Sequence, residues 1–420
     1  MSEMYGWAGK VLRVDLTSGQ VSQEDTDPYL PFVGGRGLGL KVIADEAPTA
    51  GAFDEENRLI IANGPLSGTL APASGRCTII AVSPETYPKE QVTHSSIGGF
   101  FGAELKFAGF DAIIFQGRAR TPVFLWVHDG KAELRPATHL WGLDTFETQK
   151  TLQKELSGEA EIVCIGPAGE NRVRAACVMH GTGHACGHGG FGAVMGDKGL
   201  KAVAVHGRGS VRVAHPKAFM NAVAYARSLV GTGAHWPLPT KPFWVHHQDP
   251  HDMSRQAYRS SYLLQRRSWW VDEGYATVSK NTACFACPVA CYNYMYVPKA
   301  GSAGGGDAHC QLYYGEAHNE VSWQAKQLCD RLGINAYIPT ITTGWLQWLI
   351  KNGRMTEQEI GLPMSDYGEA HFAETLLHQI AYKEGMGAIL GKGLARAAEE
   401  LGLLDELMTN EAFNYGGHGM

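Results

Sequence analysis

The sequence predicts an α+β protein in which a β-rich domain, residues 1–210, precedes an α-helical domain, residues 211–420. Before residue 210, short apolar runs recur between turns rich in Gly, Pro and Asn, which is typical of strands. After residue 210, apolar side chains recur three and four positions apart, as on one face of a helix. A chain of 420 residues is also long enough for two or three domains of about 100–200 residues each.

The first predicted strand shows the alternation of a half-buried strand. Leu12, Val14 and Leu16 alternate with the charged Arg13 and Asp15. A Thr-Ser-Gly turn follows, and it predicts a hairpin. Further strands are predicted where short runs lie between turns, at 59–62, 78–82, 112–115, 123–127, 131–134, 162–165 and 202–205. The first half is therefore expected to be β-rich.

Three helical faces are predicted in the second half. One is formed by Val321, Ala325, Leu328 and Leu332. The others are formed by Phe372, Leu376, Leu377 and Ile380, and by Leu394, Ala397, Ala398 and Leu401. Gly402 is the predicted stop of the last helix, because Gly commonly follows a helix C-terminus. The Gly-rich segment 301–306 is expected to be a loop.

Composition and charge argue against two classes of partner. The net charge is −6, so the chain has no basic footprint for nucleic acid. No run of 18 apolar residues occurs, so no membrane span is expected. The first 20 residues do not resemble a signal peptide, and we expect a cytoplasmic location. Charged residues form only 19 %, against about 25 % in typical domains, so we expect much surface to face a cofactor or another subunit.

The strongest chemical signal is a C-x2-C-x3-C run formed by Cys284, Cys287 and Cys291. Three thiolates this close can hold three corners of an iron–sulfur cube, with the fourth ligand coming from elsewhere. A proline directly after one of these cysteines is also familiar from such sites. Two alternatives stay open: a structural zinc site, which needs four ligands, and unligated core cysteines. His309 and Cys310 are the next candidate zinc ligands.

Two glycine-rich segments are candidate phosphate cradles. Residues 95–102 follow a β-like segment and precede a helical-looking one, and residues 187–196 form the second segment. Backbone amides that glycines leave accessible can bind phosphate, particularly at a helix N-terminus. Neither segment matches the P-loop pattern or a dinucleotide fingerprint. From the residues alone, tight turns for packing are the favoured interpretation.

The segment from Asp330 to Asn335 predicts the C-terminal end of a helix. Gly333 is a normal stop after the apolar face that ends at Leu332. Asp330 is electrostatically unfavourable there, because a helix C-terminus already carries negative partial charge. This misfit hints at a ligand near Asp330.

Several motifs, in sequence order, resemble the aldehyde:ferredoxin oxidoreductases, a family of tungsten- or molybdenum-pterin enzymes. They are GWAGK at 6–10, VDLT at 14–17, VGGRGLG at 33–39, NGPLSGT at 63–69, IGPAGEN at 165–171 and GAVMGDKGLKA at 192–202. The cysteine run and the Asp-x-x-Gly-Ile turn fall in the family's order. The resemblance extends to about residue 404, and so many independent motifs in order make it specific.

The resemblance implies a two-sheet N-terminal domain that forms the base for two metallopterins, with helical domains covering them. It implies three cofactors: a tungsten- or molybdenum-bis-pterin, a 4Fe-4S cluster, and Mg²⁺ bridging the pterin phosphates. Cys284, Cys287 and Cys291 would ligate the cluster. The turn that contacts a pterin would be formed by Asp330, Gly333 and Ile334.

The pterin-phosphate side is also assigned by the resemblance. Its residues would be Arg76, Ser96, Gly98, Gly99, His188, Gly189 and Gly190. His188 stands where the family usually has Arg, and Ser96 where Asn is common. Because a histidine is charged only part of the time near neutral pH, a phosphate contact by His188 is expected to depend on pH.

Candidate acid–base groups lie after the cysteines, where the family places a Glu near the metal. Glu316 and His318 are the candidate catalytic residues. A buried Glu beside a pterin site can have a raised pKa and act as general base for water. A solvated loop carboxylate is an equal alternative. For His246, His247 and His251, an exposed loop is favoured over a metal or substrate site.

The function implied is that of an enzyme of EC 1.2.7 type. It would exchange two electrons between an aldehyde/carboxylate-type substrate and ferredoxin, or an iron–sulfur electron-transfer subunit, through the cluster. Residues 98–106 look closer to the branch with tungsten subunits of aryl-CoA reductases, in which the electron flow reverses. Such a subunit is one alternative, and a non-catalytic cluster-binding scaffold subunit is another.

The family's third domain is expected to be absent from this chain, because residue 420 lies roughly where that domain begins. It normally brings the fourth cluster cysteine, a second Asp-x-x-Gly-Leu turn and a catalytic His. We therefore expect a C-terminal extension or a partner chain to complete the site, and an oligomeric protein. Without that domain, Cys310 is the next candidate for the fourth ligand.

Overall fold

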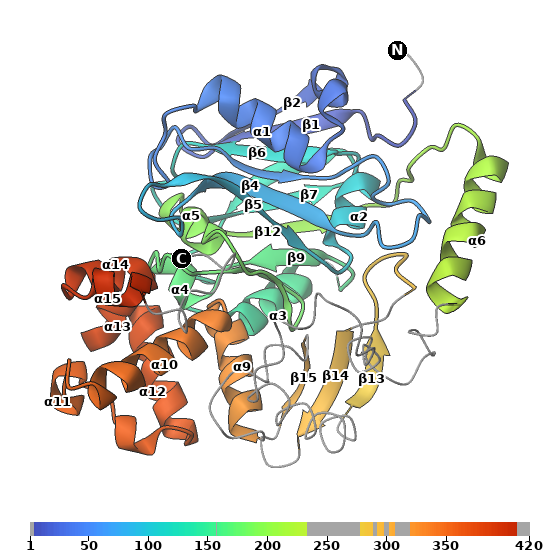
Figure 1. Ribbon diagram of the computed structural model, residues 1–420. Coiled ribbons are helices and arrows are strands. Elements are labelled where there is room, and N and C mark those ends of the chain that lie inside the picture. The colour runs from blue at the N-terminus through green and yellow to red at the C-terminus, as the bar shows by residue number, and fades with distance from the viewer. Residues whose placement is uncertain are drawn as a thin grey trace.

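Two β-sheets form the N-terminal half of the molecule and helices form most of the remainder (Figure 1). The computed structural model describes residues 4–156, 158–232, 278–288, 292–297, 302–306 and 320–409. The predicted α+β class, with two sheets followed by helices, is confirmed. None of the helices in these ranges has the length and apolar character needed to cross a bilayer.

The first sheet has the strand order β2-β1-β6-β3-β4-β5. Its strands are β1 (Lys10–Asp15), β2 (Gln20–Asp25), β3 (Leu59–Ala62), β4 (Cys77–Ser83), β5 (Gln91–Ile97) and β6 (Ala112–Gln116). β1 and β6 run parallel, and the other neighbouring pairs are antiparallel. Helix α1 (Gly35–Glu46) covers one face, because Leu38, Val42 and Ile43 pack against its apolar side chains.

The second sheet has the order β11-β10-β9-β12-β7-β8. Its strands are β7 (Val123–His128), β8 (Lys131–Pro136), β9 (Glu161–Cys164), β10 (Val178–His180), β11 (His184–Cys186) and β12 (Leu200–His206). Side chains from both sheets share one core with the helices α2 (Phe101–Phe107) and α5 (Phe191–Asp197). On the other face, α3 (Thr145–Glu155) packs through Leu152, and the short α4 (Pro167–Glu170) follows β9.

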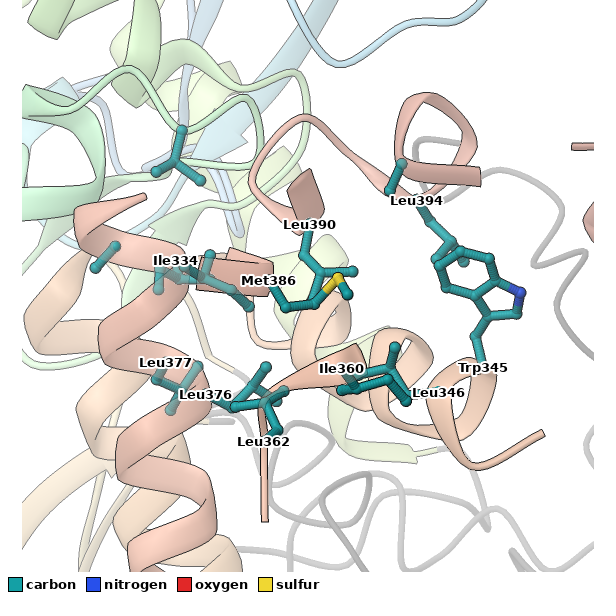
Figure 2. Close-up of a cluster of buried hydrophobic side chains, with 14 of the residues drawn as sticks. Ile334, Trp345, Leu346, Ile360, Leu362, Leu376, Leu377, Met386, Leu390 and Leu394 are labelled. Carbon is teal, nitrogen blue, oxygen red and sulfur yellow. The ribbon is translucent and has the colours of Figure 1, made fainter. Parts of the chain in front are cut away.

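A separate apolar core holds the C-terminal helices together (Figure 2). Trp345 and Leu346 of α10 belong to the same core as Leu376 and Leu377 of α12, and all four are fully buried. The helices that this core joins are α9 (Glu320–Leu332), α10 (Tyr337–Lys351), α11 (Glu357–Ile360), α12 (Ala370–Tyr382), α13 (Gly385–Leu390), α14 (Leu394–Glu400) and α15 (Leu404–Thr409). Helix α6 (Pro216–Thr232) contributes none of its described side chains to this core and lies apart from these helices (Figure 1). Burying large aliphatic and aromatic side chains in this way stabilises the helices against one another.

The expectation of a loop at 301–306 is wrong. This segment contains β15 (Ser302–Gly306), the edge of a three-stranded sheet with β13 (Val278–Thr282) and β14 (Tyr292–Val297). Its glycines carry no alternating pattern that predicts a strand, yet their backbone groups pair in register with β14, as Gly305 does with Tyr294. The second half is thus helical with one small sheet, not helical throughout.

The predicted strands and helical faces all occur. The runs at 59–62, 78–82, 112–115, 123–127, 131–134, 162–165 and 202–205 fall on β3, β4, β6, β7, β8, β9 and β12. The three helical faces fall on α9, α12 and α14. Gly402 follows the end of α14 with a φ of +70°, which confirms it as the stop. The three-residue strands β10 and β11 were not predicted, because they are too short for a pattern.

Candidate functional site

The first wall of the central cavity is built from the ends of two neighbouring strands. Antiparallel pairing of Cys77 in β4 with Ile97 in β5 brings Arg76 and Gly98, which flank these strands, side by side. The Arg76 guanidinium donates a hydrogen bond of 2.7 Å to the carbonyl of Ser96. The strand register therefore fixes a cation beside the glycine turn that leads into α2.

The glycine turn after β5 passes close to other parts of the protein. Gly99 has a φ of +89°, and a Cβ there would lie 2.3 Å from Cδ2 of His180. A Cβ on Gly98 would lie 2.8 Å from Sγ of Cys284. Gly99 therefore requires glycine, because its φ is positive and a Cβ would meet the buried His180 ring. At Gly98, a Cβ would displace the ends of neighbouring side chains.

The second wall is the glycine-rich segment after β11. His188 faces the cavity, whereas Gly189 and Gly190 do not line it. The backbone amide of Gly189 instead donates a hydrogen bond of 2.5 Å to the buried carboxyl of Glu85. Burial raises the pKa of Glu85 to about 8. A protonated acid thus anchors this segment from behind.

The third wall is the C-terminal end of α9. Gly333 takes a φ of +74°, and the amide of Ile334 donates to the carbonyl of Cys329 over 2.8 Å, which closes the helix as predicted. The turn is docked onto the second sheet, because Cys177 N donates to Gly333 O over 2.8 Å and Asn335 N to Ala175 O over 3.1 Å. These backbone bonds hold the end of α9 against the cavity.

Asp330 forms a buried ion pair with Lys326 at the end of α9. Both side chains line the cavity, and the two residues are each only 4 % exposed. Burial raises the pKa of Asp330 to about 6, although the Lys326 ammonium opposes this rise. The electrostatic misfit predicted for Asp330 is thus offset by a cation one turn earlier.

The three walls enclose a cavity of about 480 Å³. The sequence-predicted residues that line it are Arg76, Ser96, Gly98, His188, Cys284, Asp330 and Ile334. Gly99, Gly189, Gly190 and Gly333 belong to the same turns but do not line it. The structure therefore brings together residues from four distant segments of the chain.

The loop with the first two cysteines is attached to the glycine turn. Phe285 N donates to Gly99 O over 3.1 Å, and Cys287 N donates to Cys284 O over 3.0 Å. The Phe285 ring makes edge contacts with the rings of Phe100 and Phe107. Cys284 therefore reaches the cavity edge with a half-buried thiol.

Several predicted residues lie outside the described part of the chain. They are His246, His247, His251, Cys291, His309, Cys310, Glu316 and His318. Within the part that is described, no three His, Cys, Asp or Glu side chains are grouped as a metal site. The roles that the resemblance gives to these residues stay predictions.

Sequence reasoning missed other residues that line the cavity. They include His94, Cys177, His184, Lys326, Asn335 and Tyr337. Lys326 carried a usable signal, because it lies four residues before Asp330 on one helix face. Nothing in the local sequence marks the others. The Nδ2 atom of Asn335 is buried and has no hydrogen-bond partner among the described residues.

Comparison with known proteins identifies the family. Residues 11–207 match the model for the N-terminal domain of aldehyde ferredoxin oxidoreductase, and residues 215–414 match the model for its domains 2 and 3. The chain belongs to the aldehyde ferredoxin oxidoreductase family. The resemblance predicted from the motifs is confirmed.

Relatives of the chain carry more specific descriptions. It is 33 % identical over 437 residues to the tungsten-containing aldehyde ferredoxin oxidoreductase of Pyrococcus furiosus, covering 97 % of this chain and 69 % of that protein. It is also 33 % identical over 426 residues to an aliphatic sulfonate oxidoreductase, WOR-like subunit, of the same organism, covering 94 % and 67 %.

A solved structure is also similar. It is the active-site complex BamBC of benzoyl coenzyme A reductase with 1,5-dienoyl-CoA, with a TM-score of 0.83 and 29 % identity. The match covers 97 % of this chain and 65 % of that chain, so the present chain spans just under two thirds of its length. Aldehyde ferredoxin oxidoreductases are oxidoreductases of EC 1.2.7 type, and the family's tungsten-containing members imply a tungsten–pterin cofactor.

Proposed function

We propose that this chain is a tungsten bis-pterin oxidoreductase that oxidises an aldehyde to a carboxylate and passes the electrons to ferredoxin through a 4Fe-4S cluster. The observation that carries this proposal is the cavity itself. It places a cationic strand end, a paired carboxylate and a cysteine of the C-x2-C-x3-C run around one space. The carboxylate and the cysteine come from two family motifs, and the resemblance assigns Arg76 of the strand end to the pterin-phosphate side.

The cavity residues fit a pterin with phosphate groups. Asn335 offers a buried amide donor without a partner among the described residues, which is costly unless a ligand accepts its hydrogen bond. The carboxylate of Asp330 can accept hydrogen bonds from the ring N–H groups of a pterin. Arg76 and His188 lie where they can bind phosphate oxygens, and we include Mg²⁺ bridging those phosphates in the proposal.

Cys284, Cys287 and Cys291 would hold three corners of the cluster. When bound, the tungsten–pterin group supplies two-electron redox chemistry and the cluster supplies one-electron transfer. The chain itself orients these groups: the hydrogen bond between Phe285 and Gly99 ties the cysteine loop to the glycine turn. We keep Glu316 as the proposed general base for water and His318 as its neighbour.

A second candidate function is that of the tungsten subunit of an aryl-CoA reductase-like complex. The similar benzoyl coenzyme A reductase structure, with its TM-score of 0.83, favours it. In that case, the electrons flow towards the substrate instead of away from it. A cluster-binding scaffold without catalysis is the third candidate.

The proposed partner is ferredoxin or an iron–sulfur electron-transfer subunit. The similar structure is a complex of two kinds of subunit, and a relative is described as a subunit, which supports a multi-subunit assembly. Completion of the site by a C-terminal extension or partner chain, molybdenum in place of tungsten, oligomerisation and a cytoplasmic location stay predictions.

The test is an anaerobic assay of the purified, metal-loaded protein with its natural partner chains. We expect aldehydes to reduce ferredoxin, with turnover lost in Asp330→Asn because its tungsten is lost. Reduction of an aryl-CoA thioester by reduced ferredoxin, without aldehyde oxidation, would establish the second function instead. Neither reaction, in protein that holds tungsten and iron, would contradict both enzyme functions and favour the scaffold.

A further inference from the structure

A group of acids and histidines lies directly behind the cavity wall, and the proposed chemistry does not use it. Its members are Glu104, Glu159, Glu161, His180 and His206. Glu104 belongs to α2, Glu161 to β9, His180 to β10 and His206 to β12. Glu159 lies two residues before β9 begins. The helix α2 packs against both β9 and β12 (Figure 1). This packing brings the elements that carry these side chains together behind the glycine turn.

The hydrogen bonds of His180 define its protonation. Its Nδ1 lies 2.8 Å from the carbonyl oxygen of Ile162. Because a carbonyl only accepts, Nδ1 carries the hydrogen. Its Nε2 accepts a hydrogen bond of 3.3 Å from the backbone amide of Phe100. A neutral His180 therefore presents a lone pair at Nε2.

The same Nε2 lies 3.2 Å from a carboxyl oxygen of Glu161. A lone pair facing an ionised carboxylate at this distance would be repulsive, so one proton must lie between the two groups. A protonated Glu161 that donates to Nε2 shares the single lone pair of this atom with the Phe100 amide. An imidazolium would be less favourable, because its Nε2 hydrogen would face the Phe100 amide as a second donor. Burial raises the pKa of Glu161 and lowers the pKa of His180, which favours the same arrangement.

The group extends from this pair to solvent. The carboxylate of Glu104 accepts a hydrogen bond of 2.9 Å from Gly207 N and lies 3.8 Å from Nδ1 of His206. The Nε2 atom of His206 lies 3.8 Å from the carboxylate of Glu159, whose side chain is 82 % exposed. Burial raises the pKa of Glu104, against the opposing effects of the Gly207 hydrogen bond and of His206. These groups therefore sense one another's charge.

The group also reaches the cavity. His184 lines the cavity, and its ring stacks on that of His180 with the ring centroids 6.0 Å apart. The glycine turn lies directly against His180. A Cβ on Gly99 would be 2.3 Å from the His180 ring, so no side chain fits between them. The stacking thus places His180 and the Glu161 carboxyl directly behind a residue that lines the cavity.

We propose that His180 and Glu161 hold one shared proton beneath the cavity and, with Glu104, His206 and Glu159, carry protons between the cavity and solvent. This inference rests on the proposed oxidation. Aldehyde and water give a carboxylate, three protons and two electrons. The electrons pass to a one-electron acceptor of the ferredoxin class, and the protons must leave the cavity. In the reductive direction, the same route delivers protons.

Glu161→Gln tests the proton without removing the hydrogen bond. The Gln amide can still donate to Nε2 of His180, but it cannot give up a proton. We expect unchanged tungsten and iron contents, turnover lowered at least about tenfold, and a larger solvent hydrogen-isotope effect. Glu161→Asp, which keeps an acid, should recover part of the rate. The matched control is Glu155→Gln, which alters the exposed pair of Glu155 with His139 at 2.9 Å and should change neither quantity.

Infrared spectroscopy of the resting protein gives a readout that needs no turnover. Glu85 also holds a proton near neutral pH, so the signal is the difference between the two proteins. We expect the wild type to show a protonated-carboxyl band, sensitive to hydrogen isotope, that adds to the band of Glu85 and is lost in Glu161→Gln. Full turnover in Glu161→Gln, or identical infrared spectra of the two proteins, would overturn the proposal. A wild type without aldehyde or thioester turnover would contradict the proposed function, while the infrared band still decides whether the pair holds the proton. If Glu161→Gln loses tungsten, Glu159→Gln replaces it in the kinetic test, and wild-type kinetics there would overturn the route.

Discussion

Two buried lysine–aspartate pairs lie in different regions and have different surroundings. Lys106 and Asp111, in the first sheet region, have side chains with no exposed surface and an N–O distance of 2.5 Å. Asp111 also accepts hydrogen bonds from Ala8 N, Gly9 N and the hydroxyl of Thr26. The pair of Lys326 and Asp330 on α9 lines the cavity instead.

The difference indicates which pair serves structure and which serves binding. A buried ion pair is tolerated when further hydrogen bonds satisfy the remaining polar atoms. Asp111 has such bonds from the N-terminal segment, so its pair fastens that segment to the sheet. Among the contacts that the structure describes, the Asp330 carboxyl has only Lys326, and the pKa of Asp330 is raised to about 6. That pair is therefore the one suited to take a ligand.

The largest expected effect follows from breaking the structural pair. Asp111→Asn leaves the Lys106 ammonium buried without a counter-charge, and such a loss costs about 3–5 kcal/mol of unfolding free energy. Urea denaturation measures it. The matched control is Asp45→Asn, which breaks the exposed pair with Lys41 and should cost less than about 1 kcal/mol. Equal costs for the two variants would contradict the structural role.

At the cavity pair, we expect a loss of cofactor instead of a comparable loss of stability. Asp330→Asn removes the carboxylate that would accept hydrogen bonds from the pterin, and we expect the tungsten content per chain to fall at least about tenfold. Iron should stay unchanged. Elemental analysis of the purified variant measures both. Equal loss of tungsten and iron would mean that the turn is only structural.

Cys287→Ser tests the opposite pattern, in which iron is lost and tungsten is retained. Removing one thiolate should abolish the visible iron–sulfur absorbance and most of the iron, because a cube with too few ligands is not retained. Part of the tungsten should remain, since Cys287 does not line the cavity. Visible absorption and metal analysis provide the measurement, and unchanged iron would refute the assignment of the cysteines.

A smaller effect is expected at Glu85, a buried acid behind Gly189. Its pKa of about 8 in the folded state lies above the ordinary value of 4.5, so the folded state holds the proton more tightly. Its contribution to stability is therefore full below about pH 4.5 and is lost as the pH rises to about 8. Glu85→Gln should gain stability relative to the wild type over this range. Urea titrations from pH 5 to pH 8 measure it, with the exposed Glu56→Gln as control; parallel curves would contradict the shift.

Much of the fold could be predicted from local sequence patterns. Short apolar runs predicted most strands, because the side chains of a strand in the core must be apolar. Apolar residues spaced three and four positions apart predicted α9, α12 and α14. β15 could not be predicted, because its pairing with β14 depends on backbone groups and not on its glycine side chains.

The cavity could be predicted only in part. Family motifs supplied Arg76, Gly98 and Asp330, whereas Lys326 and His184 join them through the packing of α9 and β11. The partner of His180 depends on a contact between β10 and β9, which no local pattern reveals. Residues that act through tertiary contacts therefore need the structure.

The central claim is that this cavity holds a tungsten–pterin group beside an iron–sulfur cluster. Metal analysis of the anaerobically purified protein tests it most directly. The account predicts tungsten together with about four iron atoms per chain. Iron or zinc alone, with neither tungsten nor molybdenum, would contradict it.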